Sequence, residues 1–459
     1  MVSGGTPETT GQRPVPPTTC CALFAFLLIL LITSASGLAQ TILLQNGIVH
    51  TVSGEIFTNG GVLINGGKIE QVLDGKRPER IIAGKTIDLK GQHLYPGLIA
   101  LNTTLGLAEI EAVRATRDDV EVGDYMPDVQ SWIAVNPDSE LIPVARANGI
   151  AYFEATPEGA IVSGQSALLA MDGWTPEQMA IKKPTALHVF WPRMELDTGP
   201  RQGGGRRGGS GEAGKSLTEQ AKDRRAKVKA IGEFFDDAKA YAKAKDAAAK
   251  GGTPAPEKIP AWEAMLPYVH GELPIVIHAD EVRQIKSAVS WATTTKSKII
   301  LAGGRDAWMV ADLLATNKVA VIYEHIFTQP SRDTESYDSH FKAPELLRKD
   351  GVQVVFGVGR DPSFERNLPY VAAQAVAFGL PETEALKGIT LYPAQLMGVS
   401  DRLGSIEPGK EATLFVCDGD ILDLRANVKQ MWIAGKEVSL ESRHTRLYEK
   451  YKNRPPPAK

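Results

Sequence analysis

The sequence is poor in cysteine, carries no excess of either charge, and lacks an apolar run long enough to cross a membrane as a helix. Only three of the 459 residues are cysteines, which argues against a disulfide-rich fold. With 51 basic and 54 acidic residues, the formal net charge is −3, so nothing favours a nucleic-acid or membrane-surface partner. A hydrophobic content of 43% instead indicates a globular chain, long enough for one large barrel or two ordinary domains.

An apolar run at residues 20–32 is followed by small residues that end in Gly37, Leu38 and Ala39. The run is shorter than the roughly 20 residues of a membrane-spanning helix. It therefore predicts a signal peptide over residues 1–39, cleaved before Gln40, and a periplasmic or secreted protein. An uncleaved anchor is the alternative. Cleavage would leave Cys417 as the sole cysteine, with no partner for an internal disulfide.

Short apolar runs separated by glycine-rich turns make up residues 41–94, and a similar set follows at 412–438. The Asn-Gly pairs that begin at Asn46, Asn59 and Asn65 predict hairpin turns between these runs. Two β-rich segments on either side of a long middle predict one small β-sandwich domain, built from residues 40–94 and 404–440.

The middle of the chain, residues 95–403, alternates apolar runs with helical stretches, which is typical of βαβ units. The number and spacing of the runs favour an α/β fold with a (β/α)₈ TIM-type barrel over an open sheet. The predicted strands are 94–101, 150–155, 187–191, 275–279, 298–302, 319–323 and 352–356.

A charged segment at 194–258 interrupts this alternation and is predicted to be a solvated insertion. Within it, Ser216 and Glu219 have the spacing of a capping box, which predicts a helix that continues to about Lys250. Residues 441–459 are predicted to form a C-terminal tail.

Four stretches resemble the amidohydrolase superfamily, and most closely its imidazolonepropionase-like branch: Tyr95-Pro96-Gly97-Leu98-Ile99, Arg366-Asn367-Leu368-Pro369-Tyr370, residues 379–399 and residues 402–414. The resemblance implies a hydrolase of non-peptide carbon–nitrogen bonds in small molecules. It also implies one or two divalent metal ions, typically zinc, at the C-terminal ends of the barrel strands. The balanced charge predicts no nucleic-acid partner, and a homo-oligomer is possible.

The positions at which the family places its metal ligands are largely changed in this sequence. Asn102 and Thr104 stand where the first strand would carry two histidines, and we assign them to substrate binding. His278 ends an apolar strand at a family histidine position and is the predicted metal ligand. Gly303 stands where the next histidine is expected and has no side chain to coordinate anything. Zinc usually needs three protein ligands, so the expected zinc is doubtful here.

The last predicted strand leaves two residues competing for the place of the family's acidic base. If Asp361 points inward, it is the catalytic general base; if Arg360 does, it presents a positive charge for substrate binding. Replacement ligands could come from the acidic loop between Glu109 and Asp124, which also has the pattern of an ion-paired surface. The sequence thus predicts an amidohydrolase-family hydrolase with a reduced or rebuilt metal site. The alternative is a catalytically silent barrel that binds small molecules or acts as a scaffold.

Overall fold

The computed structural model describes residues 41–76, 81–110, 112–197, 215–251, 254–359 and 361–455. The predicted signal peptide and Arg360 lie outside these residues. Within them, no helix is both long enough and apolar enough to span a bilayer.

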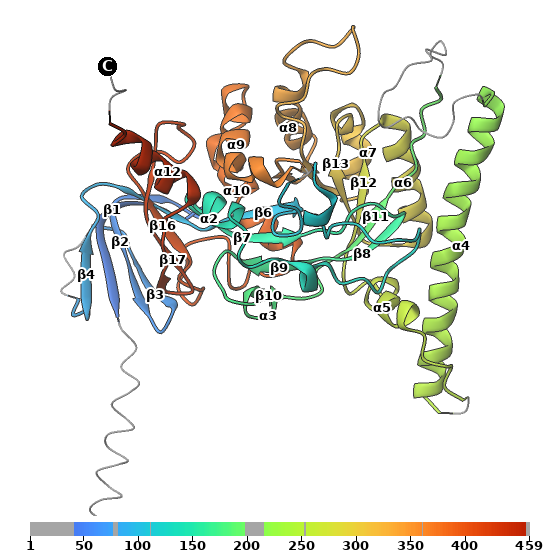
Figure 1. Ribbon diagram of the computed structural model, residues 1–459, viewed down its shortest axis with the longest axis horizontal. Helices are drawn as coiled ribbons and strands as arrows, with labels where there is room; N and C mark the ends of the chain where they lie inside the picture. The colour runs from blue at the N-terminus through green and yellow to red at the C-terminus, as the bar shows by residue number, and fades with distance from the viewer. Residues whose placement is uncertain are drawn as a thin grey trace, which may run out of the picture.

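One eight-stranded sheet combines strands from both ends of the chain, which lie side by side in Figure 1. Its order is β18-β17-β16-β5-β1-β2-β3, and β4 also pairs with β1. Its apolar face buries Leu44, Ile64, Leu414 and Trp432 in a common core. The division of the chain into a separate β-sandwich domain stays a prediction. The strands are β1 (Ile42–His50), β2 (Ile56–Asn65), β3 (Lys68–Leu73), β4 (Lys85–Asp88), β5 (His93–Pro96), β16 (Leu414–Cys417), β17 (Val428–Ile433) and β18 (Lys436–Glu437).

Only one of the three Asn-Gly pairs forms the expected hairpin turn. Asn65 ends β2, and the chain turns at the next two glycines before β3. Asn46 instead lies inside β1 with a φ of 59°, at a register shift in its pairing with β2. Asn59 lies inside β2. An asparagine that adopts the left-handed conformation can form a β-bulge as well as a turn, and the dipeptide alone does not distinguish the two.

The remaining strands form two further sheets in the centre of the molecule. One has the order β10-β9-β7-β6 and the other β15-β14-β13-β12-β11-β8. Neighbouring strands from β11 to β15 are parallel, as are β6 and β7. Each predicted strand of the middle region overlaps an observed one. The strands are β6 (Leu98–Thr103), β7 (Ile150–Ala155), β8 (Val162–Gln165), β9 (Ala167–Ala170), β10 (Ala180–Lys182), β11 (Leu187–Phe190), β12 (Ile275–Ala279), β13 (Ile299–Gly303), β14 (Ala320–Tyr323) and β15 (Val354–Phe356).

Ser166 separates β8 from β9 and connects the two sheets. Its backbone N–H donates to the Ala186 carbonyl at 3.0 Å. The β8–β9 segment runs antiparallel to β11 on one side and to β7 on the other. The antiparallel β8–β9 segment therefore departs from the all-parallel (β/α)₈ pattern that the sequence predicted. In the part of the chain that the structure describes, β6 and β15 are not paired by backbone hydrogen bonds.

Gly97 lies where the predicted strand 94–101 divides into β5 and β6. A Cβ there would come within 2.5 Å of the Ala151 Cβ and 2.7 Å of the Thr413 methyl group. Glycine therefore allows the chain to pass directly from the eight-stranded sheet into the central sheets.

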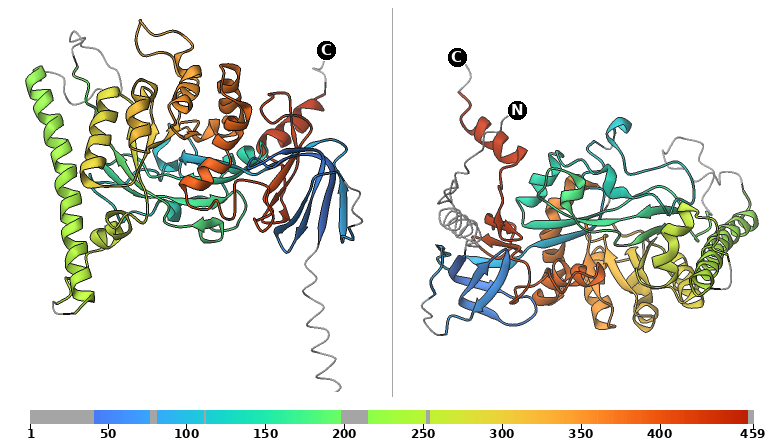
Figure 2. Two further views of the ribbon diagram at one scale, coloured as in Figure 1. Left: turned by 180° about the vertical axis from the view of Figure 1, so that it is seen from behind. Right: turned by 90° about the horizontal axis from the view of Figure 1, so that it is seen from below.

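The helices cover the central sheets, and α4 (Leu217–Ala249) stands at the end opposite the eight-stranded sheet (Figures 1 and 2). It begins with the predicted capping box of Ser216 and Glu219. One side is packed rather than solvated, because Ile231, Phe235 and Ala238 are buried in the main core. The other α-helices are α2 (Leu141–Arg146), α3 (Pro176–Met179), α5 (Pro260–Val269), α6 (Val282–Thr295), α7 (Ala311–Thr316), α8 (Ser339–Lys349), α9 (Leu368–Ala377), α10 (Glu382–Gly388), α11 (Leu391–Leu396) and α12 (Arg443–Lys452).

Candidate active site

A cavity of about 610 Å³ lies at the C-terminal ends of β11 to β15. This is the edge at which parallel α/β sheets and barrels carry their sites, because the loops after successive strands converge there. Both acidic and basic side chains line it, including His278, Asp280, Arg305, Glu324 and His325. The cavity is large enough for a small molecule.

Asp280 and His325 form a hydrogen-bonded pair in this cavity. The Nε2 atom of His325 lies 2.7 Å from Oδ1 of Asp280. Gly303, at the end of β13, makes room for the pair, since a Cβ there would lie 2.5 Å from the same Oδ1. The Asp280 carboxylate thus occupies space that a side chain at position 303 would need. Burial acts to raise the pKa of Asp280, but the hydrogen bond from His325 and the Arg305 backbone N–H outweigh it and hold the pKa below its usual value.

Glu324 is placed in a similar way at the end of β14. Its Oε1 accepts a 2.5 Å hydrogen bond from Nδ2 of Asn102, at the end of β6. A Cβ at Gly357 would lie 2.9 Å from its Cγ, so a glycine after β15 is needed to accommodate it. Asn102 has a φ of 59°, which places its backbone in the left-handed region. Asn102 therefore contacts a cavity-lining carboxylate rather than lining the cavity itself.

His278 lines the cavity and joins a buried polar chain behind it. Its Nε2 lies 3.0 Å from Nδ1 of His188 on β11, and its ring stacks on Phe190 with centroids 3.9 Å apart. The Nε2 of His188 lies 3.6 Å from Oε1 of Glu154 on β7. Burial acts to raise the pKa of Glu154, but the nearby His188 and hydrogen bonds from Ser166 and the Asn102 backbone N–H hold it below its usual value.

Glu154 and His188 were not singled out from the sequence. Glu154 is the charged residue of β7, His188 is the histidine of the otherwise apolar strand β11, and each is completely buried. A polar residue in an apolar strand needs a partner, and this signal could have identified both.

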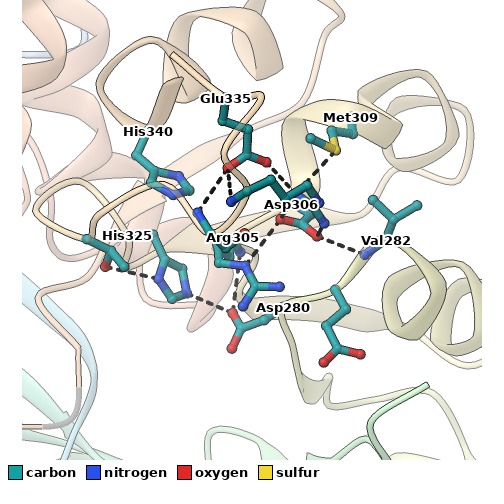
Figure 3. Close-up of polar contacts among 12 residues, drawn as sticks. Asp280, Val282, Arg305, Asp306, Met309, His325, Glu335 and His340 are labelled. Carbon is teal, nitrogen blue, oxygen red and sulfur yellow. Dashed lines mark hydrogen bonds and ion pairs between the residues drawn. The ribbon is translucent and has the colours of Figure 1, made fainter. Parts of the chain in front are cut away.

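A buried ionic cluster supports the loop after β13 (Figure 3). Asp306, which is fully buried, accepts hydrogen bonds from Nε of Arg305 at 3.2 Å and from Nη1 of Arg332 at 3.1 Å. Its second oxygen accepts from the Val282 backbone N–H at the start of α6. Because Asp306 restrains the Arg305 guanidinium, a positive charge is held at the wall of the cavity.

Glu365 lies behind the cavity, in the short helix η5 (Pro362–Asn367). It is 1% exposed, and neither carboxyl oxygen makes a hydrogen bond. Burial raises its pKa to about 8, with a further contribution from the charge of Glu324, while Thr103 acts in the opposite direction. Glu365 is therefore largely protonated at neutral pH. Sequence analysis did not single it out.

The remaining predicted site residues lie outside the cavity lining or outside the described chain. Asp361 caps η5, where Oδ1 accepts from the backbone N–H and hydroxyl of Ser363 at 2.9 and 2.6 Å. Thr104 is buried, and its carbonyl accepts from the backbone N–H of Leu107 and of Ala108. Arg360 is not among the described residues. The roles assigned to these three residues stay predictions.

In the acidic loop after β6, Asp119 pairs with Arg117 through two hydrogen bonds of 3.2 and 2.8 Å. The cavity is lined instead by residues from the ends of β11 to β15 and the loops that follow them.

Comparisons with known proteins find similarity to amidohydrolases. Residues 228–438 match the amidohydrolase family. A crystal structure of an amidohydrolase from Thermotoga maritima superposes with a TM-score of 0.74 at 26% identity, and the match covers 87% of this chain and 99% of that one. A putative prolidase from Bifidobacterium longum has a TM-score of 0.50 at 16% identity, with 90% and 100% covered, which shows the fold alone. These structures indicate an α/β TIM-barrel-type fold with a second domain.

Among curated proteins, the amidohydrolase tasK of Hapsidospora irregularis is 23% identical over 407 residues, 82% of this chain. This chain spans 39% of that relative's length. Taken together, the sequence and structural matches show that the chain is similar to members of the amidohydrolase superfamily.

Members of this superfamily are typically metal-dependent, but the residues described here do not fit the usual metal centre. Within the described ranges, no group of three or more His, Cys, Asp or Glu side chains is arranged to hold a metal ion. His278 directs its Nε2 at His188, and the amide nitrogen of Asn102 is bonded to Glu324. The space beside Gly303 is filled by Asp280.

Proposed function

We propose that this protein is a hydrolase of non-peptide carbon–nitrogen bonds in small molecules, of the imidazolonepropionase-like branch, with the metal site of its superfamily rebuilt. The observation that carries the proposal is the Asp280–His325 pair in the cavity. A carboxylate can only accept hydrogen bonds, so in neutral His325 it keeps the proton on Nε2 and leaves Nδ1 as a base. Hydrolysis needs such a group to remove a proton from the attacking oxygen.

The charges around the pair support a reaction in which negative charge develops. Arg305 lines the same cavity and is held in place by Asp306. A fixed positive group in a partly enclosed site stabilises an oxyanion more than it would in water. In this proposal His278 also lines the site, with its ring orientation set by His188 and Phe190.

A screen for amine release would test this function. N-acetyl amino acids, lactams and N-acyl amino sugars carry such bonds and give a free amine on hydrolysis. His325→Asn should lower the rate by about 10²–10⁴-fold, because it removes the base. His270→Asn is the matched control, since His270 is partly exposed at the end of α5, away from the cavity lining. Equal rates for wild type and His325→Asn would rule out this assignment of the base.

The second candidate is a catalytically silent barrel that binds small molecules or acts as a scaffold. It is favoured by Asn102, Thr104 and Gly303, which stand at positions where the family has histidine. If the protein only binds small molecules, a compound from the screen should raise the melting temperature of wild type and of His325→Asn equally, and neither protein should release an amine from it.

We also propose that residues 1–39 direct export and are removed. Intact-mass measurement of protein recovered from the periplasm or medium should give a chain that begins near Gln40. A chain that retains Met1 would refute cleavage.

A further inference from the structure

The loop after β14 places a hydroxyl group against the Asp280–His325 pair. Oγ1 of Thr328 lies 3.2 Å from Nδ1 of His325, on the opposite side of the ring from Asp280. The turn is held by a hydrogen bond of 3.0 Å from the Thr328 backbone N–H to the His325 carbonyl. All three residues line the cavity. Thr328, His325 and Asp280 thus form a continuous hydroxyl–imidazole–carboxylate chain that faces one space.

This order of groups is the one that nucleophilic catalysis requires. A hydroxyl is a weak nucleophile until an adjacent base takes its proton, and the base must itself be oriented by a third group. Asp280 supplies that orientation, since it keeps the proton of neutral His325 on Nε2. Nδ1 is then free to accept the proton of Thr328. The environment of Asp280 is fixed by Gly303 and by the Arg305 backbone N–H.

We infer that Thr328 is the nucleophile of this site and that hydrolysis proceeds through an acyl-threonine, an inference that deepens the proposed function and rests on it. Oγ1 attacks the carbonyl carbon of the substrate as its proton passes to Nδ1 of His325. The carbon–nitrogen bond then breaks, and the amine leaves with that proton. Water attacks the resulting ester and gives one proton to Nδ1. The carboxylic acid is released as Oγ1 regains a proton from His325, so the enzyme is restored.

Arg305 completes the arrangement for this route. The tetrahedral intermediates carry a negative oxygen, and the Arg305 guanidinium lines the same cavity. Its Nε donates to Asp306, and within the described residues its Nη atoms make no hydrogen bond. The chain therefore offers a nucleophile, a base, an orienting carboxylate and a cationic group around one space.

The hydrogen bond between Thr328 and His325 would also serve a purely positioning role, because residues three apart often bond across a turn. A covalent readout separates the two roles, since a positioning residue is never acylated. The probe is p-nitrophenyl acetate, an activated ester that acylates an activated hydroxyl whatever the natural substrate is. The reaction is quenched in acid, and the acetylated residue is located by intact-mass and peptide mass spectrometry.

Wild type and Thr328→Ser should both become acetylated at position 328, whereas Thr328→Ala and His325→Asn should not. Thr294→Ala is the matched control, since Thr294 lies on α6 and, within the described residues, its hydroxyl bonds only to the Ser290 carbonyl of its own helix. It should be acetylated at position 328 like the wild type. Thr328→Ala should also lose amide hydrolysis by about 10²-fold or more, since it removes the acyl acceptor.

The outcomes also separate this inference from the proposed function. Absence of acetyl at position 328 in wild type, or undiminished amide hydrolysis by Thr328→Ala, would overturn the nucleophile while leaving the hydrolase intact. Acetylation at position 328 with no hydrolysis of any amide in the screen would support the nucleophile and count against the proposed function.

Discussion

Glu365→Gln should remove a large part of the pH dependence of this protein's stability. Glu365 is completely buried without a hydrogen bond, and its pKa is raised from 4.5 to about 8. The folded state therefore holds a proton that the unfolded state releases. Folding stability from this group is fully present below pH 4.5 and is lost as the pH rises toward 8, above which the loss is constant. Glutamine has a similar shape and cannot titrate, so it stays neutral throughout.

The size of the effect follows from the two pKa values. One unit of pKa difference corresponds to about 1.4 kcal/mol. Integrated between pH 5 and pH 7.5, the wild type should lose about 3 kcal/mol of unfolding free energy through this residue alone. Every other titrating group contributes equally to both proteins. The difference in stability between Glu365→Gln and wild type should therefore rise by that amount over the same interval.

Urea denaturation at half-unit steps from pH 5 to 8, followed by circular dichroism, measures this difference directly. Glu70→Gln on β3 is the matched control, because Glu70 is exposed and makes no contact with the cavity. The difference in unfolding free energy between Glu70→Gln and wild type should hardly change with pH. If the Glu365→Gln difference is equally flat, Glu365 is ionised in the folded state, and the argument from its burial is wrong.

Three other perturbations test the construction of the site. Gly303→Ala should lower the free energy of unfolding, measured by urea denaturation, by about 1–2 kcal/mol or more beyond Gly351→Ala. Both glycines have φ near +87°, but a Cβ at Gly303 would meet Asp280, whereas Gly351 has open space around it. Equal losses would show that Asp280 moves freely. Asp306→Asn should cost about 3–5 kcal/mol, since it removes the buried carboxylate that pairs with both Arg305 and Arg332. Asp423→Asn, at an exposed pair, should change little. Equally small effects of the two substitutions would contradict this. Purified protein should carry well under one equivalent of zinc by metal analysis, and chelation should leave its melting temperature nearly unchanged. A full equivalent that disappears in His278→Ala would show that a metal centre exists.

The apolar patterns of the sequence were sufficient to locate most elements. The runs at 150–155 and 275–279 became β7 and β12 with the same bounds. The capping box at Ser216 correctly began a helix that ends at Ala249. These features depend on neighbours within a few residues, so local chemistry determines them. The family resemblance also singled out His278, which lines the cavity, and its role as a metal ligand stays a prediction.

Contacts between distant segments decided the rest. Asn46 forms a bulge rather than a turn because β1 has partners on both sides. From the sequence, Gly303 was predicted only to lack a coordinating side chain. In the fold, the Asp280 carboxylate occupies the space beside Gly303, and His325, which follows the next strand of the sheet, bonds to that carboxylate. Glu324 meets Asn102, which is 222 positions away. The sequence by itself determined most of the elements, because these are properties of short stretches. Only the tertiary structure decided which side chains filled the space, because several strand ends must converge before their side chains can meet.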